Sequence, residues 1–209
     1  MHKTLWRASL AAIAFSLLPA AAHPQQIAPL PPPIPAPQDI GYPAGPITLD
    51  VDATDTARHI FRIHEVVPVA GGQTVTLLYP RWLPGNHSPS GPIFQMAGLE
   101  VTANGQRLEW RRDTADVYAF HIDVPAGVNA LDLKFQYLSP TASPQGRITM
   151  TDAMLDLQWN AMVLYPAGYY ASRIRVTPSV KLPDGWTGYT ALDGARQDGA
   201  TTHYSETAL

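Results

Sequence analysis

The 209-residue sequence predicts an all-β protein, and more specifically an antiparallel β-sandwich. Three observations lead to this prediction. Short segments alternate between apolar and polar residues, as strands with one buried face do. Turn signals separate these segments, and 21 prolines and 15 glycines favour strands joined by turns over long helices. No stretch of the chain has the apolar spacing of a convincing amphipathic helix.

The composition is sufficient for one domain with a real core and restricts the classes of partner. Hydrophobic residues make up 45% of the chain and charged residues only 15%. The net charge is -3 and no basic run is present, so we expect no nucleic-acid partner. The absence of cysteine excludes disulfides, thiolate metal sites and a cysteine nucleophile.

The first 22 residues predict a secretory signal peptide. Lys3 and Arg7 precede an apolar stretch, residues 8–18, that is too short to span a bilayer comfortably. Ala20-Ala21-Ala22 then supplies a cleavage site before His23. An uncleaved anchor is the alternative. We therefore expect an exported protein, periplasmic or extracellular, with no membrane association after signal cleavage.

Residues 23–46 form a proline-rich linker. Six prolines fall between positions 29 and 37, which favours extended polyproline II and excludes a helix or a central strand. We interpret the stretch as a spacer, with a proline-motif ligand as the alternative. The β-sandwich domain is expected over residues 47–209.

In the first half of this domain, three strands and a hairpin are predicted. The strands cover residues 47–51, 58–69 and 73–79, and the hairpin joins residues 99–103 to residues 106–110. Asn104-Gly105 suits a two-residue type I′ turn. In the second strand, Phe61 and Ile63 are expected to share one face. Residues 93–98 are expected to be irregular or a short helical turn.

The second half continues the alternation. Phe120, Ile122 and Val124 predict a strand face opposite a solvated face that carries His121 and Asp123. Further strands are expected at residues 131–137, 172–182 and 201–204, with a loop over residues 139–151. Residues 153–165 are apolar and ambiguous between strand and short helix.

The stretch Tyr79-Pro80-Arg81-Trp82-Leu83-Pro84-Gly85-Asn86-His87 follows the third strand. Its prolines cannot continue a ladder, and Pro84-Gly85 is a strong turn signal. Two interpretations are open. Trp82 can lie in the core and close the strand end, or the stretch can be a rigid exposed loop that contacts a ligand or another domain. The candidate domain-interface or substrate-cleft residues are Trp82, Pro84, Gly85, Asn86 and His87.

Catalytic chemistry is not visible in the sequence. The nearest match to the zinc-binding H-E-x-x-H is His64-Glu65-Val66-Val67-Pro68, which ends in proline and lies in a predicted strand. A serine hydrolase using His87 with Ser88 or Ser90 would lack the G-x-S-x-G elbow, and a polar turn explains that run better. We predict no catalytic, cofactor-binding or metal-binding residue in this chain.

The run Pro80-Arg81-Trp82-Leu83-Pro84-Gly85 resembles the P-x-W-x-P-G signature of the N-terminal domain of the glycyl-aminopeptidase family. These are zinc metallopeptidases of the gluzincin type that usually carry a PDZ domain. The resemblance extends in order from residue 47 to residue 192. It includes the hairpin at residues 99–110, the segment 116–120, the strand at 131–137, and Pro183-Asp184-Gly185-Trp186 with Thr190-Ala191-Leu192. His87 stands where family members commonly carry an aromatic residue.

The resemblance implies a β-rich N-terminal domain followed by a zinc domain with H-E-x-x-H. No position of this chain matches that motif, so zinc is expected in a catalytic domain absent from this chain, and residues 205–209 look like a cut end. Intact members cleave N-terminal Gly or Ala from peptides. The implied partner is the C-terminal catalytic domain, whose cleft this domain would help to wall; a peptide substrate is expected only in the intact enzyme. The chain alone is expected to be inactive.

A free-standing exported module that binds carbohydrate or a protein ligand is the main alternative. Four aromatic side chains could form a stacking platform for such a ligand, or could pack in the core: Trp82, Trp110, Trp159 and Trp186.

Overall fold

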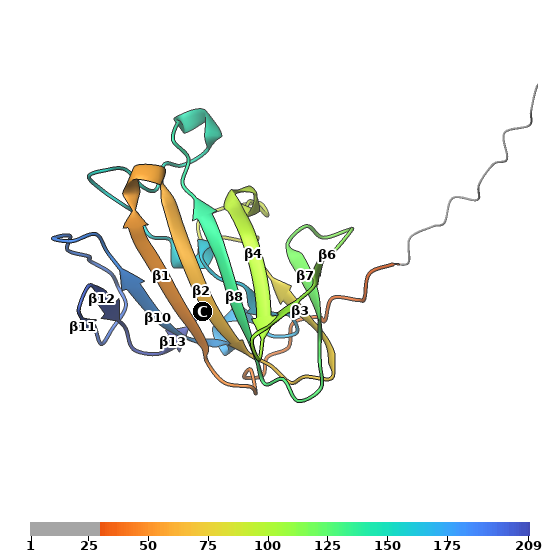
Figure 1. Ribbon diagram of the computed structural model, residues 1–209. Helices are drawn as coiled ribbons and strands as arrows, with labels where there is room; N and C mark the ends of the chain where they lie inside the picture. Colours follow the sequence, from red (N-terminus) through yellow and green to blue (C-terminus); the bar gives the residue numbers. More distant parts are fainter. Residues whose placement is uncertain (1–29) are drawn as a thin grey trace, which may run out of the picture. The chain divides into compact units, whose positions relative to one another are not determined.

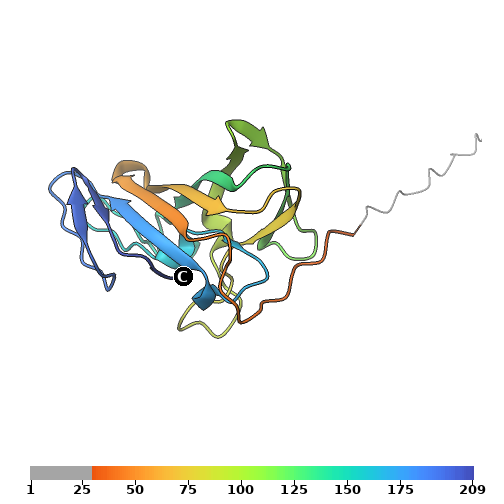
Figure 2. The same cartoon turned by 90° about the horizontal axis from the view of Figure 1, so that it is seen from below.

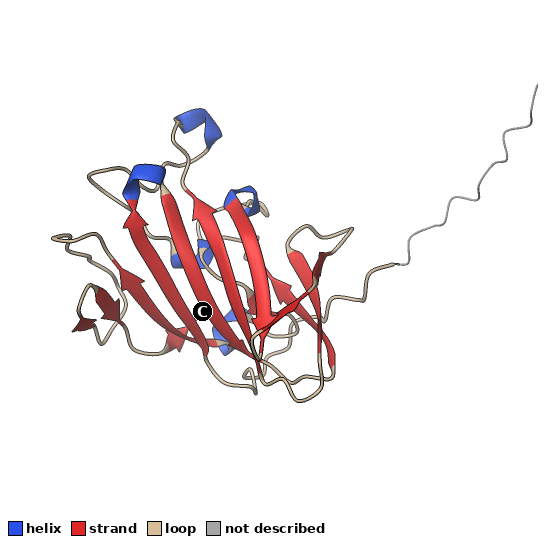
Figure 3. Cartoon of the chain, viewed as in Figure 1, coloured by secondary structure: helices blue, strands red, loops and turns tan. Residues whose placement is uncertain are grey.

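Two β-sheets packed face to face make up the computed structural model, which describes residues 30–209 (Figures 1 and 2). Strands dominate, and the helical segments of the described part are single 3-10 turns (Figure 3), so the predicted all-β sandwich is confirmed. No helix within residues 30–209 has the length and apolar character to cross a membrane. The predicted signal peptide and its cleavage site lie outside the described residues.

Nine strands form the large sheet within residues 30–209. Its order is β11-β12-β10-β1-β2-β8-β4-β5, and β13 also pairs with β10. The strands are β1 (Ile47–Asp55), β2 (Ile60–Pro68), β4 (Met96–Ala103), β5 (Gln106–Leu108), β8 (Ala130–Leu138), β10 (Arg175–Lys181), β11 (Arg196–Asp198), β12 (Thr201–His203) and β13 (Thr207–Ala208). All pairings are antiparallel except that of β1 with β10, which is parallel.

Four strands form the small sheet, in the order β6-β7-β3-β9, within the same described residues. They are β3 (Gln73–Leu78), β6 (Trp110–Arg112), β7 (Ala119–Val124) and β9 (Tyr165–Pro166). The 3-10 turns between strands are η1 (Thr56–Arg58), η2 (Ile93–Gln95), η3 (Ser143–Gln145), η4 (Trp159–Ala161) and η5 (Ala171–Arg173).

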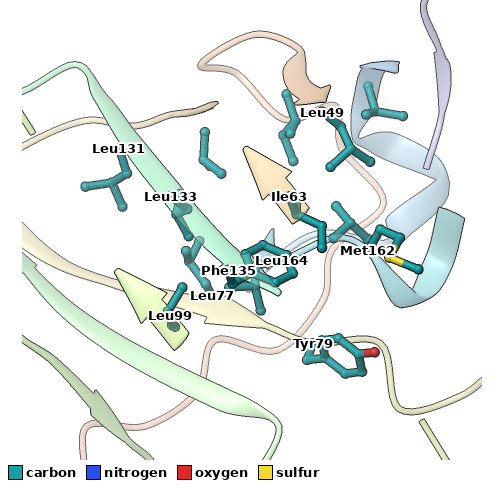
Figure 4. Close-up of a cluster of buried hydrophobic side chains, with 14 of the residues drawn as sticks. Leu49, Ile63, Leu77, Tyr79, Leu99, Leu131, Leu133, Phe135, Met162 and Leu164 are labelled. Carbon is teal, nitrogen blue, oxygen red and sulfur yellow. The ribbon is translucent and has the colours of Figure 1, made fainter. Parts of the chain in front are cut away.

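The core lies between the two sheets and follows the alternation of the strands. In β2, every second residue is buried, including Phe61 and Ile63 as predicted. Figure 4 shows these side chains meeting Leu77 of the small sheet and Leu164 of the segment between η4 and β9. Residues 161–164 are fully buried, so the apolar stretch that was ambiguous in sequence crosses the core as η4 followed by an extended chain into β9.

The predicted hairpin forms, but its second strand divides between the sheets. Asn104 and Gly105 both have positive φ, 50° and 76°, as a type I′ turn requires. Ala103 pairs with Gln106 in the large sheet, whereas Trp110 pairs with Ile122 in the small sheet. One continuous strand over residues 106–110 is therefore wrong: the chain changes sheets at Glu109.

The proline-rich stretch contacts the domain from Gln38 onward. The Gln38 N–H donates to Gly168 O at 3.0 Å, and Asp39 pairs with Arg173 at 2.5 Å. The Tyr42 hydroxyl donates to Pro68 O, and its ring packs edge-on against Tyr169. These contacts attach the end of the predicted spacer to the β-domain.

Candidate functional site

The candidate stretch forms a closed loop after β3, residues 81–91, here called the Trp82 loop. The Gly91 N–H donates to Arg81 O at 2.9 Å, which joins the two ends of the loop as in an Ω-loop. Within it, Pro84-Gly85 makes the predicted turn: Gly85 has φ 82°, and the Asn86 N–H donates to Leu83 O at 3.0 Å.

The neck of the loop requires a glycine at position 91. A Cβ added to Gly91 would lie 1.9 Å from Pro80 O and 2.9 Å from Arg81 Cα. Both are backbone atoms, which cannot rotate away as the end of a side chain can.

Trp82 lies on the outside of this loop with 62% of its surface exposed. The interpretation that placed Trp82 in the core is therefore wrong, because the flanking prolines end the strand and the loop leaves the sheet before Trp82 is reached. The buried aromatic anchor is instead Tyr79, whose hydroxyl donates to Ala161 O at 2.9 Å inside the core (Figure 4). The other four candidate residues, Pro84, Gly85, Asn86 and His87, are also exposed.

An open groove of about 1480 Å³ runs beside the Trp82 loop. Trp82 and Asn86 line it on one side, and Trp159 with the η4 region lines another part. Leu209 also lines this groove, and its N–H donates to Ile174 O at 3.0 Å. Phe94 of η2, 72% exposed, adds a second large apolar side chain to the same groove. The groove therefore combines exposed apolar surface with the last residues of the chain.

The Trp82 loop is held from the side by a short turn between β6 and β7, residues 113–118, here called the Asp113 turn. Asp116 pairs with Arg81, and the Arg81 guanidinium lies 5.6 Å from the centre of the Tyr118 ring. The Tyr118 hydroxyl lies 3.2 Å from Pro89 O and 3.1 Å from Gly91 O. The loop is thus rigidly presented rather than free.

Behind the Asp113 turn lies a buried polar trio, which sequence reasoning missed. His121 was predicted on a solvated face, but only 1% of it is exposed. Its Nδ1 lies 3.0 Å from Thr76 Oγ1 and its Nε2 lies 2.9 Å from Asp113 Oδ2. A carboxylate only accepts hydrogen bonds, so Nε2 carries a hydrogen. The prediction failed because the Asp113 turn covers this part of the small sheet, and alternation alone carries no signal for such a cover.

Asp113 is the acceptor at the centre of this arrangement. Besides His121, it accepts the N–H groups of Ala115 at 2.7 Å and Asp116 at 2.9 Å. These bonds, that of His121 first, hold the pKa of the Asp113 carboxyl below its ordinary value. A carboxylate so bonded is ionised over the neutral pH range and stabilises the turn there.

The His64-Glu65 pair lies on a strand, β2, and does not fit a zinc-binding helix. His64 points to the outer face, where its Nε2 lies 2.8 Å from Asp132 Oδ2. Glu65 points into the core, and its Oε2 accepts the Leu164 N–H at 3.0 Å. Two residues on opposite faces of one strand cannot ligate one ion. Over residues 30–209, no group of three or more His, Asp or Glu side chains is arranged to hold a metal.

Glu65 is fully buried, and its Oε1 atom has no hydrogen-bond partner. Burial raises the pKa of this carboxyl well above its ordinary value, an effect that the bond from the Leu164 N–H reduces only in part. Tyr79 and Glu65 therefore both hold the segment that runs from η4 to β9, which lines the groove.

The remaining alternatives find partial support in the geometry. In the described part of the chain, no hydrogen bond joins His87 to Ser88 or Ser90; the Ser90 hydroxyl instead accepts from Asn86 Nδ2 at 2.9 Å. Of the four tryptophans, Trp82 and Trp159 line the groove. Trp110 is half-buried, donates to Leu99 O and packs edge-on against Phe120. A platform of all four is not formed.

Comparison with protein families gives one match. The sequence model described as the Peptidase M61 N-terminal domain matches residues 48–209, which span the two sheets. No curated protein matches the sequence.

Three similar solved structures illustrate the likeness of fold. An aminopeptidase N family protein from Idiomarina loihiensis superposes with a TM-score of 0.58 at 14% identity, over 75% of this chain and 26% of that one. An M1 zinc metallopeptidase from Deinococcus radiodurans gives 0.41 at 10% identity, over 86% and 40% of the two chains. Yeast LTA4 hydrolase in complex with bestatin gives 0.42 at 9% identity, over 77% and 25%. The present chain thus spans about a quarter of the length of the first of these proteins.

Proposed function

Because this chain belongs to the Peptidase M61 N-terminal domain family, we propose that it is the non-catalytic β-domain of an exported zinc aminopeptidase-like protein. In this proposal it packs against a C-terminal catalytic domain through the groove beside the Trp82 loop. It thereby walls one side of the cleft that receives the N-terminal residue of a peptide substrate. The zinc ion belongs to the catalytic domain, and export follows from the signal sequence in residues 1–22.

The observation that carries the proposal is the composition of the groove. It brings Trp82 and Phe94, two of the largest exposed apolar side chains, together with Leu209. A domain that continued from Leu209 would begin at this groove, and exposed aromatic side chains of this size are typical anchors of protein interfaces. The partners in this proposal are the catalytic domain and, in the intact enzyme alone, a peptide; nucleic acid and membranes are not among them.

Replacement of Trp82 by Ala is expected to weaken docking of the catalytic domain by about tenfold to a hundredfold, since a buried tryptophan anchor contributes on the order of 2 kcal/mol or more. The free energy of unfolding of the isolated chain should change by less than about 0.5 kcal/mol, because the side chain is mostly exposed. Titration calorimetry with a separately produced catalytic domain of the family measures the first quantity, and urea unfolding measures the second.

Tyr189 provides the matched control, because it is 94% exposed and does not line the groove. Tyr189→Ala is expected to leave docking unchanged. Equal docking by the wild-type chain and the Trp82→Ala variant would refute the assignment of this face.

The purified chain is expected to show no hydrolysis of Gly- or Ala-arylamides, with or without added zinc. The described residues provide no zinc-ligand set, and the strand geometry of β2 separates His64 from Glu65. Release of the chromogenic amine, followed by absorbance, measures this directly. Turnover that co-purifies with the chain and is abolished by a chelator would contradict the non-catalytic assignment.

A free-standing binding module remains the second candidate, because Trp82 and Trp159 both line the groove and could stack on a sugar ring. The gene distinguishes the two proposals. An in-frame H-E-x-x-H within about one domain length after Leu209 supports the peptidase domain, whereas a stop codon there, with binding on a glycan array that Trp82→Ala abolishes, supports the module.

A further inference from the structure

We propose that the buried trio of Thr76, His121 and Asp113 positions the Trp82 loop, and that Asp113 is the residue through which it acts. The inference rests on the proposed function only in taking the Trp82 loop as the docking element. The order of that loop can be measured in the isolated chain, without any partner.

The first step is the rigidity of the trio itself. Thr76 lies on β3 and His121 on β7, and the two strands pair directly at this position. Both ring nitrogens of His121 are engaged, at 3.0 Å to Thr76 and 2.9 Å to Asp113. The His121 and Asp113 side chains are almost completely buried. A buried and fully bonded polar network fixes its members in one arrangement, because breaking any bond leaves an unsatisfied group in a low dielectric.

The second step is the shape of the Asp113 turn. While Oδ2 of Asp113 meets His121, its Oδ1 accepts the N–H groups of Ala115 and Asp116. The turn is closed by the Asp113 N–H donating to Ala119 O at 2.9 Å and by the Ala119 N–H donating to Asp116 O at 3.0 Å. One carboxylate therefore joins the small sheet to the turn that precedes β7.

The third step leads from the turn to the Trp82 loop. Asp116 Oδ1 accepts the Tyr118 N–H at 3.0 Å, while its Oδ2 pairs with Arg81, the residue next to Trp82. The Tyr118 hydroxyl meets the carbonyls of Pro89 and Gly91 at the other end of the loop. Both ends of the Trp82 loop are thus tied to the Asp113 turn, and the Asp113 turn is tied to the trio.

The test is hydrogen–deuterium exchange on peptides that cover residues 81–91, in the full chain. Asp113→Ala removes both carboxylate oxygens, and we expect exchange of these amides to rise about tenfold or more. Asp113→Asn keeps the oxygen that accepts from Ala115 and Asp116, and its amide can donate to His121 once His121 carries its hydrogen on Nδ1. This conservative variant is expected to restore protection to within about twofold of the wild type, which a loss of general stability would not explain.

Asp123→Asn is the matched control, since it changes a carboxylate on the same strand that bonds Thr74 and Arg111 instead of the turn. Its exchange at residues 81–91 is expected to be unchanged. If Asp113→Ala does not fold, Thr76→Val and Asp116→Asn carry the test, with the same expected rise. Unchanged exchange at residues 81–91 in a folded variant, or an equal rise in Asp123→Asn, would overturn the proposal. A chain whose loop responds as expected but that does not bind a catalytic domain would contradict the proposed function alone.

Discussion

Replacement of Glu65 by Gln is expected to stabilise the protein at pH 8 by about 1–3 kcal/mol, the cost of one unsatisfied buried polar group that can also ionise. Glu65 lies on β2 between Leu49 of β1 and Leu133 of β8, with Leu164 above it (Figure 4 labels these three leucines). Its surroundings are apolar, and only its Oε2 has a partner. Glutamine keeps the acceptor for the Leu164 N–H and removes the ionisable group.

The pH dependence of this effect has a defined sign. Burial raises the pKa of Glu65 in the folded state above its ordinary value of 4.5, so the folded state holds the proton more tightly than the unfolded state does. Stability from this group is fully present below about pH 4.5 and is lost as pH rises toward the folded-state pKa. The variant and the wild type should therefore be about equally stable at pH 4 and diverge as pH increases.

Glu100→Gln is the control, because Glu100 is an exposed glutamate on β4 that only approaches Arg107 at 4.0 Å. It should show no pH-dependent gain relative to the wild type. Urea unfolding of the three proteins between pH 4 and pH 8 makes the comparison, and parallel curves for Glu65→Gln and the wild type would show that Glu65 does not titrate as described.

Gly91→Ala is expected to destabilise the protein by about 1–3 kcal/mol, the usual range for a forced steric insertion, and to weaken docking at least tenfold. The new methyl group would lie 1.9 Å from Pro80 O, so the backbone at the neck of the Trp82 loop has to move. The bond from the Gly91 N–H to Arg81 O would be strained by the same shift. Thermal unfolding and calorimetric titration measure the two effects.

Gly41→Ala is the corresponding control, because a Cβ at Gly41 meets nothing within 4 Å. Its effect on stability should stay within about 0.5 kcal/mol. A Gly91→Ala variant that matches Gly41→Ala in both measurements would mean that the neck adjusts freely and does not fix the loop.

Alternation in the sequence was sufficient to predict the strands, because each strand of this sandwich buries one face. The buried positions of β2 and β8 follow the pattern residue by residue, with Phe61 and Ile63 in one and Leu131 and Leu133 in the other. The Asn104-Gly105 turn was predictable for a local reason, since both residues tolerate positive φ. These are properties of neighbours in sequence.

The features that failed or were missed depend on distant residues. Glu65 occupies an inward position of β2 because the buried Leu164 N–H, 99 residues later, needs an acceptor. His121 is buried because the Asp113 turn folds over it, and Trp82 is exposed because Tyr79 already fills the core position at the strand end. Residue types alone carry no information on which distant group will arrive. The family signature located the candidate loop but not the side chains that hold it.

The parallel pairing of β1 with β10 bears on how this chain is made. Ile47 is among the first residues of the sheet to leave the ribosome, but its partner Val176 emerges only near the end of the described chain. Until then the outer edge of β1 has no neighbour, and an open, apolar strand edge is a template for pairing between molecules. Completion of the sheet is therefore late and non-local, which slows folding and favours holding the young chain unfolded until its synthesis is finished.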